Sequence, residues 1–427
     1  MKNKKTLMAL SLSCLLVSTY SQAKSSLGAY VDHDAWSLTT IDQFNADTAR
    51  DVSTINVFST FDHDWNNLTV QASNIVSRNA VPMISWMPYS SQNSESNVLL
   101  EIVDGQWDDY IASWIADFKG WQESYEGDNK PSILLRFAHE FNGNWYAWGN
   151  QPENLKAAWQ YLHTKFTEAE VNDSVGWVWC ANNVDVDDHS DVIKYYPGND
   201  RVDWLSIDGY NWGSNYSFTS WKSFDETFSQ QYVKMVTAIP NKPLMLAEVS
   251  SAEGHDLPDT NWGQNGDDND ANESKEAWIA DMLQSIQTSY PAIKSIVWFN
   301  TNKELSWALN QAGNTGITAY NDAVIEDFFS GAMNIKSTVD ASEPVGGVLT
   351  DIIDPAPKGK DKVKGNKKEQ QSSRSVDSVK LTGIEKAMDV SRMPVVVGER
   401  LLEKEAEGLR NMPKEELLRW RAKEIVE

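Results

Sequence analysis

Short apolar runs alternate with longer amphipathic segments along the first three quarters of the chain. Eight of the apolar runs have the length and the β-branched or aromatic content of buried strands, and they cover residues 27–31, 55–59, 82–87, 133–139, 175–181, 204–210, 244–249 and 295–300. Segments with helical periodicity lie between them, for example at 68–78, 107–121, 153–170 and 273–289. Strands that alternate with helices predict a parallel sheet, and eight repeats predict its closure into a (β/α)8 TIM barrel of the α/β class.

The rival arrangement is an open, doubly wound sheet. Sheets of that kind that bind nucleotides carry a glycine-rich turn directly after the first strand. Residues 32–37, which follow the first predicted strand, contain no glycine. The closed barrel is therefore the favoured prediction.

The two ends of the chain differ from this pattern. Lys2, Lys4 and Lys5 precede a short apolar stretch at 6–18, and small residues end at Ala23, which predicts a signal peptide over 1–23 and a secreted protein. The apolar stretch is too short for a membrane span. We expect the catalytic barrel over 24–340, and a linker with a short helical tail of unknown role over 341–427, because residues 358–375 are almost free of apolar side chains.

Charge and tryptophan are concentrated in the predicted barrel. Residues 24–340 contain 17 Lys and Arg against 45 Asp and Glu, a net charge of −28, and they hold 18 of the 19 tryptophans. A surface this acidic repels phosphates, so the composition excludes a nucleic-acid partner. It suits a neutral ligand with flat apolar faces, such as a sugar.

The cysteines predict no disulfide, and the acidic clusters predict no metal site. Cys180 is the one cysteine after the predicted signal peptide, so no intrachain disulfide can form there, and we interpret it as a small buried residue. The acidic runs at 185–189 and 266–270 lack the twelve-residue calcium-loop pattern, and solvated loops are expected instead. We expect no metal, no cofactor and a monomeric protein.

Carboxylates end two of the predicted strands. Glu140 ends the fourth and Glu248 the seventh, and the carboxyl ends of barrel strands form the active-site face. Glycosidic cleavage needs one protonated carboxyl and one ionised carboxylate, and two like charges held close together favour that difference. Each Glu taken alone could instead be a buried ion-pair partner of Arg136 or Lys242. Two of them at matching strand ends favour the catalytic interpretation.

Several ordered segments resemble glycoside hydrolase family 26. Residues 136–148 (RFAHEFNGNWYAW) are similar to its acid/base signature, and residues 242–248 (KPLMLAE) to its nucleophile strand. Further similar blocks lie at 195–204, 207–212 and 296–300, so that the resemblance covers about 27–330. It implies a retaining mechanism, with Glu140 as the acid/base and Glu248 as the nucleophile. Retention in turn requires the two carboxyl groups to lie roughly 5–5.5 Å apart.

The resemblance also implies roles for the surrounding side chains. His139 matches a residue that hydrogen-bonds around the nucleophile, and Tyr210 matches one that orients it. Trp298 matches an aromatic platform under the sugar. We further expect the cleft to be lined by Trp145 and Trp148, and the carboxylates to be supported by Arg136 and Asp208.

The substrate expected first is β-1,4-mannan, the commonest in the family. Phe137-Ala138 and Tyr146-Ala147 depart from the usual mannanase pattern, however. They are closer to members that cleave mixed-linkage β-1,3-1,4-glucan or β-1,3-xylan, which stay as alternatives. A noncatalytic carbohydrate-binding barrel is a further alternative, and it predicts the loss of one Glu, whereas both are present.

Overall fold

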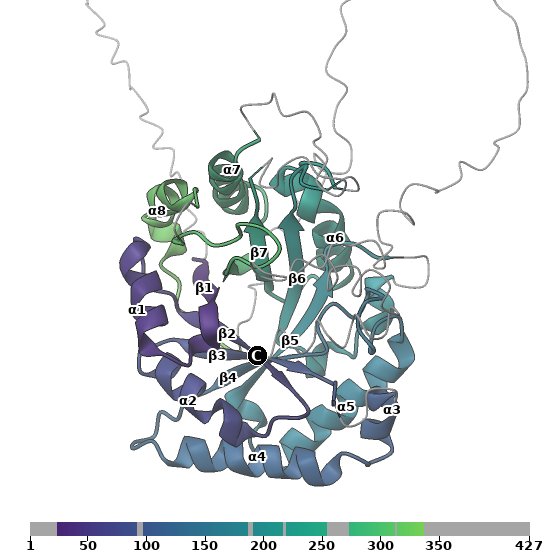
Figure 1. The fold of residues 1–427 in the computed structure, drawn as a ribbon. Helices are drawn as coiled ribbons and strands as arrows, with labels where there is room; N and C mark the ends of the chain where they lie inside the picture. Colours follow the sequence, from purple (N-terminus) through teal and green to yellow (C-terminus); the bar gives the residue numbers. More distant parts are fainter. Residues whose placement is uncertain are drawn as a thin grey trace, which may run out of the picture.

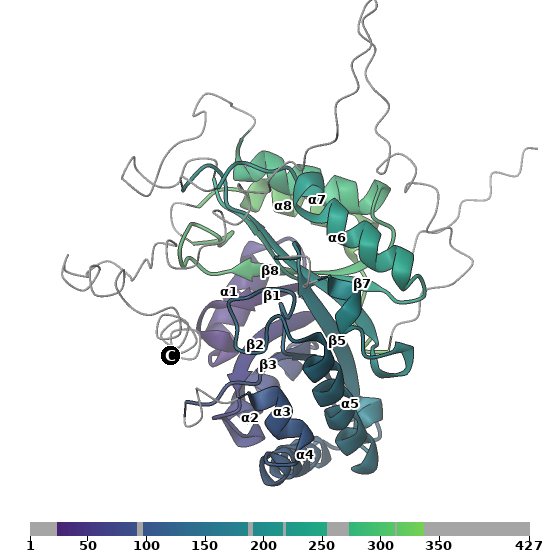
Figure 2. The same ribbon diagram turned by 90° about the vertical axis from the view of Figure 1, so that its right-hand side faces the viewer.

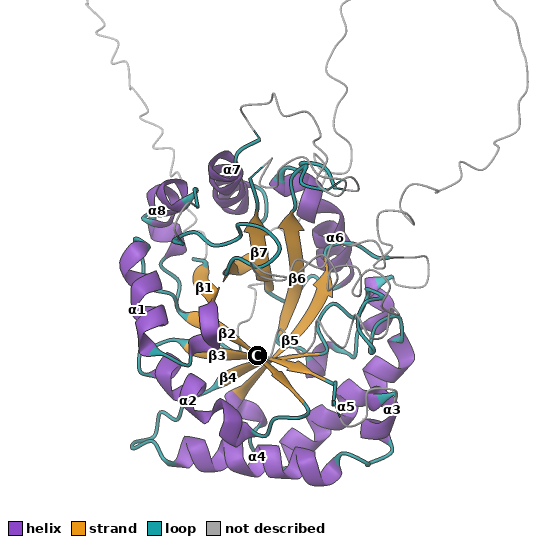
Figure 3. Cartoon of the chain, in the orientation of Figure 1, coloured by secondary structure: helices purple, strands orange, loops and turns teal. Residues whose placement is uncertain are grey.

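The barrel is closed, with all eight strands parallel and in sequence order around it. The computed structural model describes residues 24–91, 97–186, 191–216, 219–253, 273–311 and 314–336. Each strand pairs with its neighbours along the chain (Figures 1 and 3), and β8 pairs with β1 to close the circle (Figure 2). The strands are β1 (Ser26–Val31), β2 (Thr54–Thr60), β3 (Val81–Met87), β4 (Ile133–Phe137), β5 (Val175–Asn182), β6 (Trp204–Asn211), β7 (Leu244–Ser251) and β8 (Ile293–Asn300).

Helices surround the strands on the outside, as Figures 1 and 2 show from two directions. They are α1 (Leu38–Asp47), α2 (Trp65–Val76), α3 (Val98–Val103), α4 (Asp108–Glu123), α5 (Pro152–Glu168), α6 (Phe224–Ala238), α7 (Lys275–Thr288) and α8 (Ile317–Val324). The described residues also form short 3₁₀ segments, namely η1 (Asp32–Ala35), η2 (Asn172–Ser174), η3 (Val192–Tyr195), η4 (Asn199–Arg201) and η5 (Asp327–Phe329).

Local sequence explains where several helices begin. The side chains of Asp64 and Ser223 each accept a hydrogen bond from the third residue of α2 and α6, and both complete a capping box. Ser37 and Ser274 cap α1 and α7 in the simpler way. Each of these four helices therefore starts at a point that its capping side chain defines.

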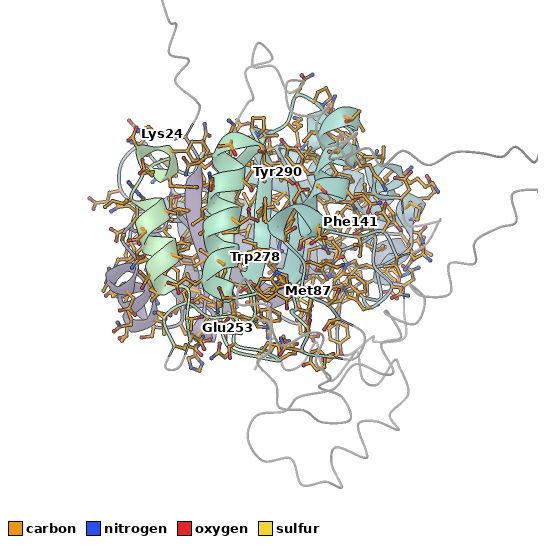
Figure 4. All side chains as sticks on the ribbon, turned by 90° about the horizontal axis from the view of Figure 1, so that it is seen from above. Lys24, Met87, Phe141, Glu253, Trp278 and Tyr290 are labelled. Carbon is orange, nitrogen blue, oxygen red and sulfur yellow. The ribbon has the colours of Figure 1, made fainter. Side chains whose placement is uncertain are left out.

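The hydrophobic core has two layers, because the strands are covered on both faces. The inner layer fills the barrel and consists of Met83, Leu134, Val178, Cys180, Trp204, Met245, Ala247 and Val297. The much larger outer layer lies between strands and helices. Trp278 on α7 and Tyr290 just after it belong to this outer layer and are labelled in Figure 4.

The two ends of the barrel bear different structures. Lys24, before β1, and Glu253, after β7, lie at opposite ends of the molecule in Figure 4. At the amino-terminal end the chain is tied down, since Lys24 Nζ lies 2.8 Å from Asp327 Oδ1 and Ser26 forms a bridge with Gly331. The carboxyl ends of the strands form the opposite mouth, where the candidate residues lie.

The predicted (β/α)8 fold is confirmed. The predicted signal peptide, the tail after residue 336 and most of the two acidic runs lie outside the described residues, and the domain limits stay predictions. Within the described ranges, no helix has the length and apolar character that a membrane crossing would need. The same ranges contain no cluster of three His, Cys, Asp or Glu side chains able to hold a metal ion.

Candidate active site

Glu140 lies three residues beyond β4, on a segment that still pairs with the strands on either side. The amide of Ala138 donates to Trp86 O at 3.0 Å, and the amide of Glu140 donates to Cys180 O at 2.9 Å. Ala138 and Glu140 both adopt positive φ angles, 49° and 53°, which non-glycine residues rarely do. The chain is thus held in an unusual conformation that places the Glu140 side chain at the mouth.

Glu248 lies within β7, and an irregularity in the strand directs its side chain. Met245 and Ala247 both belong to the inner core layer, so strict alternation would turn Glu248 toward the helices. The pairing with β6 skips Ala247, so that Leu246 lies opposite Ile207 and Glu248 opposite Asp208. An extra residue of this kind redirects the following side chain. Glu248 and Asp208 therefore both face the barrel interior.

Arg136 bridges the side chains of Asp208 and Glu248. Its side chain is fully buried, with Nη1 donating to Asp208 Oδ2 at 2.8 Å and Nη2 donating to Glu248 Oε1. Nε donates to Ser85 Oγ at 2.7 Å, so the guanidinium is fixed from three directions. Burial raises the pKa of Asp208 well above its usual range, against the opposing effect of Arg136. The cation thus lies between two buried acids.

The remaining oxygen of Glu248 accepts a hydrogen bond from Tyr210. The distance from Tyr210 Oη to Glu248 Oε2 is 2.5 Å. Burial, followed by the charge of Glu248, raises the pKa of Tyr210 well above its usual value, so the phenol keeps its proton and donates. Both oxygens of Glu248 are therefore held in place by donors.

Glu140 has a different environment. Trp145 Nε1 donates to its Oε2 at 2.7 Å and Asn182 Nδ2 to its Oε1 at 3.1 Å, and neither donor is charged. Burial, and after it the charge of Glu248, raises the pKa of Glu140 to about 7, while the two hydrogen bonds act in the lowering direction. Near neutral pH this carboxyl is therefore protonated for part of the time.

His139, which precedes Glu140 in the sequence, is in its neutral form. Burial, and then the charge of Arg136, lowers the pKa of His139 well below its usual value. Its Nε2 lies 3.2 Å from Tyr146 Oη, so the partner that the structure gives it is a phenol, where the sequence predicted a position around the nucleophile.

Two expected sugar-stacking residues are buried instead, which corrects the prediction. Trp298 has no exposed surface and packs in the outer layer near Tyr320, because its position on β8 faces the helices. Trp148 is 2% exposed, and its ring is covered by Tyr146 at a centroid distance of 4.3 Å. Neither indole can present a face to a sugar ring.

Other aromatic side chains lie where Trp298 was expected. Phe299, the next residue on β8, is partly exposed and stacks on Tyr30 with centroids 5.0 Å apart. It also meets the ring of Tyr210 edge-on at 5.6 Å. Successive side chains of a strand face opposite sides of the sheet, so alternation along β8 was the sequence signal that only one of Trp298 and Phe299 faces the barrel interior.

Sequence reasoning also missed Asn182, the last residue of β5 and a direct partner of Glu140. The rule that strand ends carry the site residues would have identified it. The predicted fifth strand ended one residue too early, at Ala181.

Comparison with known proteins gives a family match and similar sequences. Residues 64–285 match the sequence profile of glycosyl hydrolase family 26. Endoglucanase H of Acetivibrio thermocellus is 30% identical over 306 residues, which cover 70% of this chain and 30% of that protein. A mannan endo-1,4-beta-mannosidase of Bacillus subtilis is 28% identical over 221 residues, 50% of this chain and 49% of that one. The chain thus spans less than half of either relative.

A solved structure supports the fold. The catalytic domain of an endo-beta-1,4-mannanase of family 26 from Bacillus sp. JAMB-750 superposes with a TM-score of 0.53 at 14% identity. The match covers 72% of this chain and 88% of the other.

Proposed function

The chain belongs to glycosyl hydrolase family 26, and from this premise we propose that it is an endo-acting β-glycanase that cleaves a polysaccharide with retention of configuration. The observation that carries the proposal is the contrast between two acidic residues at one mouth. Glu140 has a pKa of about 7, whereas Glu248 is held by Arg136 and Tyr210. One carboxyl can thus give a proton while the other attacks.

In the first step of this mechanism, a carboxylate oxygen of Glu248 attacks the anomeric carbon. Glu140 transfers its proton to the glycosidic oxygen as the bond between that oxygen and the anomeric carbon breaks. The leaving sugar departs with a free hydroxyl, and the other part stays as an ester of Glu248. In the second step Glu140 removes a proton from water, whose oxygen attacks the same carbon and restores the carboxylate of Glu248.

The electrostatics of the site support the change of role that Glu140 makes between these steps. The charge of Glu248 is one of the causes that raise the pKa of Glu140. Ester formation removes that charge, so the pKa of Glu140 falls at the stage where a base is needed.

The pH dependence of kcat/KM tests the role of Glu140 as the acid. Because only protonated Glu140 can act in the first step, we expect kcat/KM of the wild type to fall as the pH rises through about 7. Trp145→Phe removes a hydrogen bond that favours the ionised form, so the alkaline limb should move upward by about 0.5–1 in pH.

A matched control is Trp107→Phe, since Trp107 Nε1 donates to Glu101 Oε2 at 3.0 Å outside the site. That variant should keep the wild-type limb. A limb that stays in place, or moves to lower pH, in Trp145→Phe would contradict the assignment of Glu140.

Mannan is the substrate that we propose first, because the B. subtilis relative and the superposed structure are both named as mannan-cleaving enzymes. Mixed-linkage β-1,3-1,4-glucan is the second candidate. It is favoured by the relative matched over 70% of this chain, which is named an endoglucanase.

The deciding experiment offers galactomannan, barley β-glucan and β-1,3-xylan to the wild-type protein. We expect internal cleavage of one of the first two, and a first product of unchanged anomeric configuration by proton NMR. Inverted configuration would refute the mechanism. Binding without cleavage of any of the three would favour the noncatalytic barrel.

We also propose that residues 1–23 are removed during secretion. Amino-terminal sequencing of the protein from the medium or periplasm should begin at Lys24. A cytoplasmic protein that retains Met1 would contradict this.

A further inference from the structure

The turn that carries Glu140 is joined to the end of β5 by one buried side chain, Asn142. Its Oδ1 accepts from the amide of Asn182 at 2.7 Å, and its Nδ2 lies 3.1 Å from the carbonyl oxygen of the same residue. Asn142 has no exposed surface. The side-chain amide of Asn142 thus makes the two hydrogen bonds to the Asn182 backbone that a neighbouring strand would otherwise make.

This arrangement continues the pairing of β4 with β5 after β4 has ended. The regular register stops at Leu135 opposite Trp177. The amide of Glu140 then bonds to Cys180 O, and Asn142 bonds to Asn182, two residues further along each chain. Side chains two residues apart on a strand face the same way, so the extended pairing keeps Asn182 on the side of the barrel mouth.

The same side chain is anchored further from the mouth. Asn142 Nδ2 also lies 3.0 Å from Val184 O and 2.9 Å from Asp185 Oδ1. Asp185 in turn accepts from Gln231 at 3.0 Å and from Lys234, both on α6. The turn after β4, the end of β5 and α6 are therefore connected through one amide.

The orientation of the Asn182 amide follows from its own contacts. Its Oδ1 accepts from the amide of Val184 at 3.1 Å. Because the oxygen is engaged there, the Nδ2 group is the one that faces Glu140 Oε1. Asn182 can thus only donate to the acid.

We propose that Asn142 and Asn182 are positioning residues for the proton transfer, with Asn142 holding Asn182 in the place from which its amide fixes the Glu140 carboxyl. This inference rests on the proposed function of Glu140. It adds a pair of residues that acts on the acid through hydrogen bonds. A misplaced acid loses rate steeply, because proton transfer needs hydrogen-bond geometry.

The test compares Asn182→Ala, Asn142→Ala and the double variant. The hydrogen bond from Asn182 favours ionised Glu140, so its loss should move the alkaline limb of kcat/KM upward by about 0.5–1 in pH. We expect kcat to fall about 10- to 100-fold in each single variant, with a smaller change in KM. Since both residues act through one contact, the double variant should match Asn182→Ala.

The other ionisable groups that act on Glu140 are unchanged in these variants, and they are Glu248, Arg136, Asp208, Tyr146 and Tyr210. The matched control is Asn321→Ala. Its side-chain amide also bridges a backbone carbonyl and a backbone amide, at the end of α1 and just after it, with Nδ2 at 2.9 Å from Asp47 O and Oδ1 at 2.9 Å from Ala49 N. We expect it to lower Tm without moving the limb.

A lower Tm with an unchanged limb and unchanged kcat in Asn142→Ala would show a merely structural role and overturn the inference. If Asn142→Ala does not fold, an unchanged limb in Asn182→Ala overturns it equally. Titration of the Glu140 carboxyl by ¹³C NMR, assigned with Glu140→Gln, measures the same upward shift without any substrate. A wild type that cleaves no glycan would therefore refute the proposed function while the positioning effect is still measured.

Discussion

Glu248→Ala is expected to lower polysaccharide hydrolysis by about 10⁴- to 10⁶-fold, the range seen when a nucleophile is removed from an otherwise intact site. The carboxylate that attacks is lost, while Arg136 and Tyr210, which hold it, remain. Added azide should restore part of the rate, because a small anion can occupy the space left by the side chain. The azide product should have the inverted configuration.

Glu253→Ala is the matched control, since Glu253 also lies at the carboxyl end of β7. Glu253 Oε2 accepts from the backbone amide of Lys275 at 3.0 Å and its carbonyl from Asn215, which makes it a structural residue. That variant should keep most of the activity. Near-normal hydrolysis by Glu248→Ala, or a complete loss in Glu253→Ala alone, would show that the nucleophile has been wrongly assigned.

Arg136→Met should give the largest loss of stability. The substitution leaves Asp208 and Glu248 buried without their cation, and breaking a buried ion pair from one side costs about 3–5 kcal/mol of unfolding free energy. Without the cation the pKa of Asp208 rises further, because Arg136 is the group that acts to lower it. The unfolded state then ionises before the folded state does, so the loss should be small near pH 4 and grow as the pH increases. Urea unfolding at pH 5 and pH 8 measures the difference.

Arg78→Met is the control, because Arg78 pairs with Asp42 at the surface. It should unfold like the wild type at both pH values. If Arg136→Met were as stable as the wild type at pH 8, the view of Arg136 as the group that keeps these two acids in place would be wrong.

Much of the fold could be predicted from the sequence because both faces of the sheet are buried. Each strand is then a nearly continuous apolar run, and such runs are easily distinguished from the amphipathic helices between them. A polar residue at the end of such a run is unusual, which is how Glu140 and Glu248 could be identified.

The direction in which a strand residue points was harder to predict. Trp298 lies near the carboxyl end of its strand as Glu248 does, yet it faces the helices. The direction of Glu248 depends on the extra residue at Ala247, and nothing in the run LMLAEVSS indicates which residue is bulged. Pairing with the neighbouring strand decides whether a side chain faces the barrel interior or the helices. That pairing involves residues far away along the chain.

The partners of the acid were missed for a related reason. Asn142 and Asn182 are forty positions apart, and either could be an ordinary loop asparagine when considered alone. Their relation appears only when the end of β5 lies beside the turn after β4. Side-chain contacts across two loops have no periodicity that a single sequence could display.

Closure of the barrel by β8 against β1 has a consequence for how the protein is made. The paired residues Val31 and Asn300 belong to opposite ends of the barrel sequence. At about 5–20 residues per second, β8 leaves the ribosome roughly 15–50 s after β1. Throughout that interval the sheet cannot close, and its edge strands present unpaired backbone N–H and C=O groups with which other chains can pair. A factor that shields the edge of β1 during synthesis should therefore raise the yield of folded barrel more than any change at its mouth.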